Sequence, residues 1–512
     1  MQAELRRRRA SDVEPPNKYL SDAAHFPGGH AARIVVPRHV SEIPDIVRSA
    51  GSLLAVGAQS SLTGGATPMG EVVLSTEKLN RILAIGDGFI TVEAGLPVAA
   101  IQDALAKTGA WFPPVPTFTG AFAGGIVATN AAGAATFRHG AVRAWVEALT
   151  VVLADGTELA LRRGERRASD LGVPVPTYRM PGVDKVSAGY YAAPDMDAVD
   201  LFVGSEGTLG VITTVTFRSL SPIPTTALAF VPCASEPEAL ALVGELRGER
   251  AVAAIEHMDR RCLEILREDG ADRRNDVRVP DGTSLALLVQ MELPPGTTEA
   301  EAFDQIEASL SSGAPDTALA RICRMLQTHG VFDETEMALP GNVRRAEQLI
   351  AVRESVPAGV NSRVGRAQQT IDGRIAKTAA DMIVPFQRFA EMMAIYREGF
   401  ASRGLDYAIW GHISDGNVHP NVLPRSYADV ERGKEAILHF GREVARLGGC
   451  PLAEHGVGRN PVKQRLLREL YGDGGIDQMR AVKRALDPTG KMAPGVIFES
   501  LVHDNPTIAP SA

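Results

Sequence analysis

The chain of 512 residues has few cysteines, no long apolar run and no excess of positive charge. Its four cysteines are widely spaced and form no CxxC pair, which disfavours an iron–sulfur cluster or a cysteine-based zinc site and indicates a reducing compartment. No apolar stretch reaches the ~18 residues of a transmembrane helix. The formal net charge of −8 gives no general attraction to nucleic acid or to an anionic membrane.

The N-terminal run of arginines, residues 6–9, is followed by polar rather than apolar residues. The sequence therefore does not predict a secretory signal. We expect a cytoplasmic protein, free or peripheral to a membrane, that has no transmembrane segment and binds no nucleic acid.

The two commonest nucleotide-binding motifs are also absent. There is no G-x-G-x-x-G and no P-loop lysine motif, which disfavours a Rossmann domain. The 50 glycines instead cluster in short loops, among them 56–68, 113–133 and 201–215. Each loop alone fits an ordinary turn of small residues. Together they predict one extended ligand, because backbone N–H groups and hydroxyls in such loops can bind phosphate.

The hydrophobic pattern divides the chain into three parts. Short strands separated by glycine, with occasional helices, predict an α+β module over residues 25–222. Strands that alternate with helices predict a second α+β domain, with an antiparallel sheet, over 223–440. The remaining part, 441–500, is expected to contain two terminal helices near 461–471 and 476–486.

The stretch "GHISDGNVHP", residues 411–420, carries two histidines. Asp415-Gly416 is a strong signal for a two-residue hairpin turn, which would place His412 opposite His419 on one face. Two imidazoles so placed could hold one metal ion. They could equally be an ordinary polar pair, and the hairpin alone leaves both interpretations open.

A second stretch, "AEHGVGR" at 453–459, adds a carboxylate to the two histidines. His412, His419 and Glu454 would suit zinc with an open coordination position, and the same set fits manganese or iron. Glu454 and His455 cannot both point to one site from a regular strand, because consecutive strand residues face opposite sides. The nearby glycines make an irregular backbone credible there.

Six motifs, spread from about residue 30 to residue 498, resemble one family when taken together. They are "GAQSSLTGG", "GGIVATNAAG", "VVLADG", "DLFVGSEGTLGVIT", "GHISDGNVH" and "AEHGVG". Their order resembles the vanillyl-alcohol-oxidase-type FAD proteins, and within them the D-2-hydroxy-acid dehydrogenases, which include D-lactate and D-2-hydroxyglutarate dehydrogenases and the glycolate oxidase subunit. The resemblance implies an α+β fold with a two-part FAD-binding domain over 25–222, a substrate cap domain over 223–440, and a C-terminal segment over 441–500 that returns to the flavin.

The resemblance also implies a cofactor site. Its predicted FAD-binding residues are Gly57, Gln59, Ser60, Ser61, Leu62, Thr63, Gly64, Gly65, Gly124, Gly125, Thr129, Asn130, Gly140, Glu206, Gly210 and Ile212. The phosphate loop lacks the histidine that some relatives join covalently to the flavin, so we expect dissociable FAD.

The implied reaction removes a hydroxyl proton and delivers a hydride to the flavin N5. A bound divalent metal, zinc first and otherwise manganese or iron, would lower the hydroxyl pKa, and His455 would take the proton. Arg353 and Lys377 match the family's pattern for gripping the substrate carboxylate, as a planar guanidinium fork and an ammonium respectively.

The leading hypothesis is therefore FAD-dependent, metal-assisted oxidation of a small D-2-hydroxy acid. By the resemblance, electrons would pass to a flavoprotein, quinone or cytochrome, and the chain would form a homo-oligomer. The main alternative is a redox-neutral transferase of the alkylglycerone-phosphate synthase type, which would not need the histidine–carboxylate set. A non-heme iron oxygenase would leave the glycine-rich loops unexplained, and a purely structural flavoprotein would leave the metal ligands without a purpose.

Overall fold

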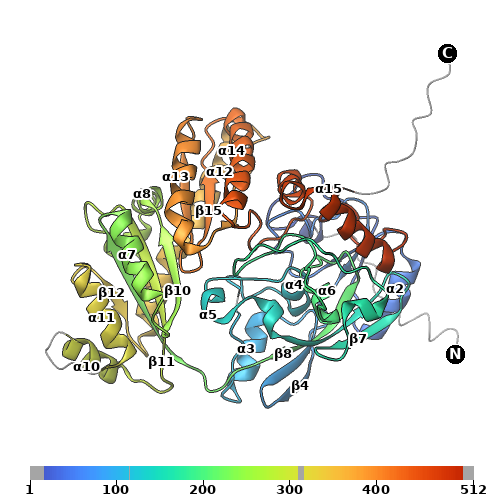
Figure 1. Ribbon diagram of the computed structural model, residues 1–512, viewed down its shortest axis with the longest axis horizontal. Coiled ribbons are helices and arrows are strands. Elements are labelled where there is room, and N and C mark those ends of the chain that lie inside the picture. Colours follow the sequence, from blue (N-terminus) through green and yellow to red (C-terminus); the bar gives the residue numbers. More distant parts are fainter. Residues whose placement is uncertain (1–16, 115, 310–315, 500–512) are drawn as a thin grey trace.

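The structure is a computed structural model that describes residues 17–114, 116–309 and 316–499. Figure 1 shows two lobes, one built from the N-terminal part of the chain and one from the middle part, with helix α15 of the C-terminal part lying against the first lobe. Both lobes mix helices with sheets. The expected α+β architecture with an antiparallel cap sheet is confirmed.

The first lobe contains a parallel three-stranded sheet, ordered β1-β3-β2, and an antiparallel five-stranded sheet, ordered β4-β5-β8-β6-β7. Its strands are β1 Arg33–Val35, β2 Leu53–Val56, β3 Val72–Ser75, β4 Ile82–Gly86, β5 Phe89–Glu93, β6 Val146–Val152, β7 Glu158–Arg162 and β8 Val211–Arg218. Its helices are η2 Asn17–Tyr19, η3 Val40–Glu42, α2 Ile43–Ser49, α3 Val98–Ala106, α4 Ala123–Ala128, α5 Thr136–His139, η4 Val142–Trp145, η5 Ala168–Leu171 and α6 Ala198–Phe202.

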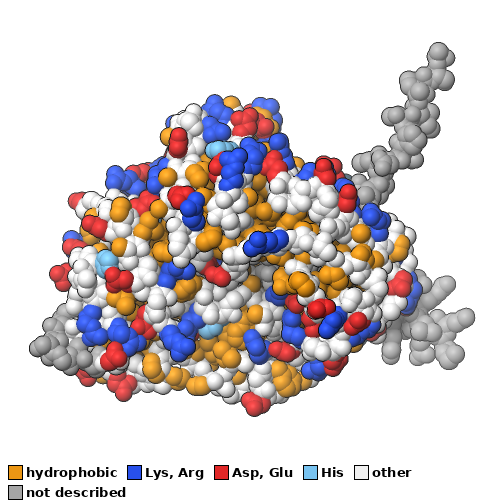
Figure 2. All heavy atoms as spheres, in the orientation of Figure 1, with side chains coloured by type: hydrophobic (Ala, Val, Ile, Leu, Met, Phe, Trp, Pro, Cys, Tyr) orange, Lys and Arg blue, Asp and Glu red, His pale blue; other side chains and the backbone are white. Residues whose placement is uncertain are grey.

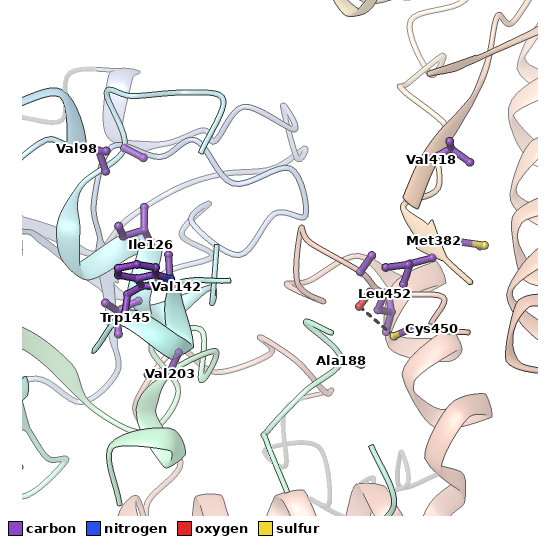
Figure 3. Packing of buried hydrophobic residues seen from close by; sticks show 14 of the residues in the cluster. Val98, Ile126, Val142, Trp145, Ala188, Val203, Met382, Val418, Cys450 and Leu452 are labelled. Carbon is purple, nitrogen blue, oxygen red and sulfur yellow. Dashed lines mark hydrogen bonds between the residues drawn. The ribbon is translucent and has the colours of Figure 1, made fainter. Parts of the chain in front are cut away.

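Helix α4 shows why the middle glycine-rich loop needs small residues. Gly124 lies so close to β5 that a Cβ there would come within 2.7 Å of the Ala94 Cβ. The glycine therefore lets the helix pack directly on the backbone of the sheet. Figure 3 shows the apolar side of this packing, where Ile126 lies beside Val142 and Trp145.

The second lobe is built on a seven-stranded sheet, ordered β12-β9-β11-β10-β14-β15-β13. Its strands are β9 Thr225–Cys233, β10 Val252–Met258, β11 Leu285–Leu293, β12 Glu336–Ala338, β13 Met382–Ile383, β14 Tyr407–His412 and β15 Asn417–Val422. Its helices are α7 Glu236–Leu246, α8 Arg260–Glu268, α9 Ala271–Arg274, α10 Glu299–Ser309, α11 Ala318–Thr328, α12 Val343–Thr370, η6 Phe386–Arg388, α13 Phe389–Ala401 and α14 Tyr427–Arg446. Helices α8, α9 and α12 share a core with one face of the sheet, while α7, α11 and α13 belong to the core on the other face.

The 28-residue helix α12, Val343–Thr370, was not predicted from the sequence. Pro357 lies inside it, and a proline removes a helical hydrogen bond and usually ends a helix. Tertiary packing outweighs that cost here, because an apolar stripe at helical spacing faces the sheet. The buried stripe comprises Leu349, Val352, Val356, Val360, Val364 and Ala367.

The C-terminal part begins with residues 450–459, which cross from the cap sheet to the first lobe and form a strap between the lobes. Cys450 pairs with Ile383 and Leu452 with Asp381, so the strap starts as an extension of the cap sheet beside β13. Figure 3 shows Cys450 and Leu452 near Met382, with the Cys450 Sγ donating to the Leu452 carbonyl at 3.2 Å. The four cysteines are all free and buried. At Val457 the chain has reached the first lobe, where its backbone N–H donates to Glu206 at 2.8 Å.

Helix α15, Pro461–Leu486, then runs along the first lobe. Gly472, with φ of 68°, interrupts its helical geometry, which accounts for the two separate helices expected from the sequence. After α15, Met492 pairs with Leu53, and the Ala493 N–H donates to the Leu53 carbonyl at 2.7 Å. Met492 and Ala493 are thereby added to the edge of the three-stranded sheet, beside β2.

Figure 2 shows acidic and basic side chains interspersed over the face in view, without a broad field of one sign. Within the described ranges, no helix is both long and apolar enough to cross a membrane.

Candidate active site

One cavity of about 300 Å³ runs through the first lobe and ends at the C-terminal strap. Residues from all three glycine-rich loops line it, and Glu454 and His455 lie at its lining too. The predicted cofactor residues that line the cavity are Gly57, Gln59, Ser60, Ser61, Leu62, Thr63, Gly65, Gly124, Gly125, Thr129, Glu206, Gly210 and Ile212. Phe118, Phe122 and Val211 also line it and were not predicted.

Three predicted cofactor residues lie outside this lining. Gly64 adopts a φ of 76° and is covered by the Phe26 ring. The Asn130 side chain accepts the Arg143 backbone N–H at 3.0 Å. Gly140 adopts a φ of 76° as the residue that ends α5. In each case a local backbone requirement explains the residue without a ligand.

The lining fits a flavin nucleotide in its shape and chemistry. The loop after β2 offers backbone N–H groups and the hydroxyls of Ser60, Ser61 and Thr63, and it contains no carboxylate that would repel a phosphate. Gly125 lines the cavity, and a Cβ there would meet no protein atom within 4 Å. The missing side chain at this position leaves space that a bound cofactor can use.

Glu206 joins this cavity to the strap. Its carboxylate accepts the backbone N–H groups of Val457 and Gly458, both at 2.8 Å. A Cβ on Gly456 would lie 2.9 Å from the Glu206 Oε1, and one on Gly458 would lie 2.2 Å from the Thr63 Oγ1. Burial raises the pKa of Glu206 to about 7, against the lowering effect of the two N–H donors. The irregular backbone expected at 454–458 is therefore present, with φ above 50° at both glycines.

The two hairpin histidines share a face, although their predicted pairing is wrong. His412 lies opposite Asn417, and Trp410 lies opposite His419. The turn contains four residues, 413–416, because the Ser414 Oγ accepts the Ile255 N–H and draws the turn towards β10. Since side chains alternate along a strand, Asn417 and His419 point to the same side, and the two imidazole centroids lie 5.5 Å apart.

Glu454 approaches both imidazoles. The His412 Nε2 lies 3.3 Å from its Oε1, and the His419 Nε2 lies 3.8 Å from its Oε2. Ligand atoms of the three residues all fall within 4.8 Å of one another, and the three side chains are buried. This is the convergence that the sequence predicted for a metal site.

Further carboxylates hold the opposite nitrogens of these rings. The His412 Nδ1 contacts Glu256, whereas Asp381 lies 3.4 Å from the His419 Nδ1 and 3.1 Å from the His455 Nδ1. Asp381 also accepts the backbone N–H groups of Glu454 and His455 at 2.8 and 2.9 Å. Carboxylates that fix the Nδ1 atoms leave the Nε2 atoms available to a ligand or a proton, as in many metal sites.

The pKa values follow from burial and from these pairs. Burial raises the pKa of Glu454, but the charges of Lys185 and His412 outweigh it and hold this pKa well below its usual value. Burial lowers the pKa of His412, while Glu256 and Glu454 raise it, with a net result of about 9. Burial raises the pKa of Asp381, but His455 and His419 hold it well below normal.

The charge balance of the centre fits a divalent cation. Four carboxylates, Glu256, Asp381, Asp415 and Glu454, lie with two cations, Lys185 and Arg353, in one contact network. Metal binding requires neutral histidines, and with these neutral two negative charges remain in excess. Without a metal, the pKa of about 9 leaves His412 protonated, and this proton offsets one of the two. Buried charges are stable only when they are compensated, and a single divalent ion would compensate these two.

The two predicted carboxylate-binding cations have different surroundings in the structure. The Nε and Nη2 of Arg353 both lie 2.6 Å from one oxygen of Glu256, so this fork supports the carboxylate behind His412. Lys377 precedes Asp381 by four residues on an extended segment, which corresponds to about 13 Å. Its side chain is exposed, and no ion pair or hydrogen bond engages it within the described part of the chain. Surrounding protein nevertheless desolvates the ammonium and lowers its pKa to about 8.

Lys185, Glu256 and Asp381 were not predicted from the sequence, and Asp415 was predicted only as a turn residue. Glu256 and Asp381 each interrupt an apolar strand, "VAAIEHM" and "ADMIV", and a buried acid in such a run is a usable signal. Lys185 had no comparable signal, because it lies in an extended segment far from the other site residues in sequence.

The chain matches two family models. Residues 31–162 match an FAD binding domain, and residues 224–497 match the C-terminal domain of FAD linked oxidases. The second match alone spans more than half of the chain, so the protein belongs to the FAD-linked oxidases and is an FAD-dependent oxidoreductase. The family resemblance and the FAD cofactor inferred from the motifs are thereby confirmed.

Named relatives extend the match to nearly the whole chain. A D-2-hydroxyglutarate dehydrogenase of Xanthomonas citri pv. viticola is 28% identical over 490 residues, which cover 93% of this chain and 91% of the relative. A D-lactate dehydrogenase of Archaeoglobus fulgidus is 27% identical over 91% of each chain, and the glycolate oxidase subunit GlcD of Bacillus subtilis is 27% identical over 91% and 88%. A solved alkyldihydroxyacetonephosphate synthase superposes with a TM-score of 0.58 at 14% identity, covering 90% of this chain and 76% of that one, which shows the shared fold alone.

The open space at Gly125 generates a direct test of the cofactor cavity. Gly125→Leu should reduce FAD occupancy at least about tenfold, because its side chain enters the cavity without clashing with the protein. The matched control is Gly365→Leu, at a helical position of α12 that is also free of neighbours within 4 Å. Flavin absorbance per protein and the thermal unfolding midpoint would be measured for both, and full flavin content in Gly125→Leu would contradict the assignment.

Proposed function

We propose that the protein oxidises a small D-2-hydroxy acid to the 2-oxo acid, with FAD and a divalent metal, zinc first and otherwise manganese or iron. The observation that carries the proposal is the single cavity that begins at the glycine-rich loop 57–65 and reaches Glu454 and His455 beside the two hairpin histidines. A hydride acceptor and a group able to activate a hydroxyl would thus act on one small molecule. The names of the D-lactate, D-2-hydroxyglutarate and glycolate-oxidising relatives support this substrate class.

His455 is suited to accept the hydroxyl proton. Its Nδ1 is held by Asp381 at 3.1 Å, and the ring lines the cavity with its side chain 30% exposed. The other ring nitrogen therefore remains available on the cavity side. Asp381 would also stabilise the imidazolium that forms, because an anion at this distance favours the protonated ring.

His412, His419 and Glu454 would hold the metal. When bound, the metal would lower the pKa of the substrate hydroxyl by polarising its oxygen. Glu256 and Asp381 would fix the ring orientations of the two histidines. Bound FAD would supply the hydride acceptor at N5, and its electrons would pass to a flavoprotein, quinone or cytochrome.

Lys377 is the better of the two candidates for the substrate carboxylate. Arg353 already binds Glu256, whereas Lys377, four residues before Asp381, is a cation that no ion pair or hydrogen bond engages within the described residues. We assign Arg353 to positioning His412 through Glu256, and Lys377 to the substrate.

A transferase of the alkylglycerone-phosphate synthase type is the alternative. The TM-score of 0.58 supports a common fold but no common reaction. The buried cluster of histidines and carboxylates favours the oxidase, because a redox-neutral transfer on the flavin has no use for a hydroxyl-activating metal.

An anaerobic visible spectrum of the purified protein tests the proposed reaction. One D-2-hydroxy acid from a panel of D and L isomers should bleach the oxidised flavin band. A chelator should abolish the bleaching, and added Zn²⁺ or Mn²⁺ should restore it. Bleaching that survives complete metal removal would retain the dehydrogenase and reject the metal role, whereas an intact flavin band that no acid bleaches would favour the transferase.

Asp381→Asn tests whether the Asp381 carboxylate assists His455 and His419 in the reaction. The amide can no longer stabilise His455 as an imidazolium, and we expect kcat to fall about 10- to 100-fold while FAD remains bound. Asp259→Asn is the control, since Asp259 caps α8 on the same sheet without contacting the three histidines. Equal losses of kcat in both variants would show that the effect is general to the lobe.

If Lys377 binds the substrate carboxylate, kcat/KM should decrease as the pH rises. Its ammonium is charged below its pKa of about 8, so kcat/KM for a carboxylate substrate should fall as the pH rises through 8. Lys377→Arg should move this decline to higher pH, because a guanidinium stays charged. Lys377→Met should lower kcat/KM about tenfold or more below pH 8 and remove this step. An unchanged profile in Lys377→Met would exclude the assignment.

A further inference from the structure

Lys185 is a fully buried lysine at the junction of three parts of the chain. It comes from the segment between η5 and α6 in the first lobe, and its side chain is 0% exposed. Its Nζ lies 2.8 Å from the Asp415 Oδ2, in the β14–β15 turn, and 2.5 Å from the Glu454 Oε1, in the strap. No glycine-rich loop or family motif drew attention to it.

The contact with Lys185 gives the two oxygens of Glu454 different surroundings. An ammonium without access to water requires carboxylate partners, so Lys185 holds the Oε1 of Glu454, the oxygen that also lies 3.3 Å from the His412 Nε2. The Oε2 faces the His419 Nε2 at 3.8 Å and has no lysine partner. A carboxylate can bind a metal through one oxygen or through both. Here Lys185 and a metal bound through both oxygens would compete for the Oε1.

We propose that Lys185 is a positioning residue that restricts Glu454 to one free oxygen towards the metal. The protein then contributes three ligand atoms, and further coordination positions remain for substrate oxygens. The positive charge of Lys185 would also weaken the protein's own hold on a cation, since like charges at short range repel. The inference rests on the proposed metal-assisted function and specifies how the protein keeps the metal open.

This role and a purely structural role predict opposite changes in metal affinity. If Lys185 only maintains the fold of the strap, its removal should misplace Glu454 and loosen the metal. If it restrains Glu454, its removal frees the second oxygen and deletes a nearby positive charge. The metal should then bind more tightly while turnover falls.

The test uses full-length, FAD-loaded protein stripped of metal by a chelator, and Mn²⁺ alone as the probe. Free Mn²⁺ would be measured by electron paramagnetic resonance during titration. We expect Lys185→Met to lower the Mn²⁺ Kd about tenfold or more and to reduce kcat for the D-2-hydroxy acid. Lys463→Met is the matched control, because Lys463 is also buried but its Nζ contacts the Gly456 carbonyl, at 3.3 Å, instead of a carboxylate. Its Mn²⁺ Kd should stay within about twofold of the wild type.

Lys185→Met leaves Asp415 unpaired, so a second variant guards against misfolding. Lys185→Met/Asp415→Asn removes both charges of that pair and should still bind Mn²⁺ more tightly than the wild type. Looser or unchanged binding in both variants, or an equal gain in Lys463→Met, would overturn the inference while leaving the metal site in place. A wild-type protein that keeps its flavin but binds no Mn²⁺ and no Zn²⁺ would instead reject the metal part of the proposed function, and this inference with it.

Discussion

The candidate active centre depends on the carboxylate of Asp381. One of its oxygens accepts the backbone N–H groups of Glu454 and His455, and the other accepts the Asn417 side-chain amide at 3.0 Å. The same side chain lies against the Nδ1 atoms of His419 and His455. A buried carboxylate is stable only when hydrogen-bond donors and cations surround it. Because these partners belong to the strap, the hairpin and two imidazoles, the carboxylate fixes their positions relative to one another. One side chain on a short edge segment thus sets the geometry of groups that are far apart in sequence.

The centre also explains why the protein tolerates so many charges in its interior. Each carboxylate has a cation or histidine within contact distance, and the four carboxylates come from four different segments of the chain. Such a network is stable only when all of its members are present, because each lost partner leaves a desolvated charge. It therefore ties the correct docking of the lobes to the correct assembly of the site.

Much of this architecture was predictable from sequence, and the failures have physical causes. The glycine-rich loops and the strand and helix pattern of both lobes depend on local backbone demands and on periodicity, which sequence records directly. Helix α12 was missed because Pro357 is unfavourable locally and only tertiary packing reveals the apolar stripe. The hairpin register was wrong because Ser414 bonds to a neighbouring strand, and the contacts of Arg353 and Lys185 were invisible because their partners lie 97 and 269 residues away. Long-range ion pairs leave no local pattern.

The strap has a mechanical consequence for the whole molecule. The backbone passes between the lobes at the connection from β8 to β9 and again at the strap, where residues 450–455 follow the cap sheet and 456–459 are gripped by Glu206 and Thr63. Side chains add further connections, because the His139 Nε2 of the first lobe lies 2.7 Å from the Glu292 Oε1 of the cap sheet, and Lys185 of the first lobe pairs with Asp415 of the cap hairpin. His455 lies where the strap crosses between the lobes. The backbone on both sides of His455 is therefore anchored, on one side to the cap sheet and on the other to the cavity wall, so the distance between the histidine cluster and the cavity is set by a few residues of main chain.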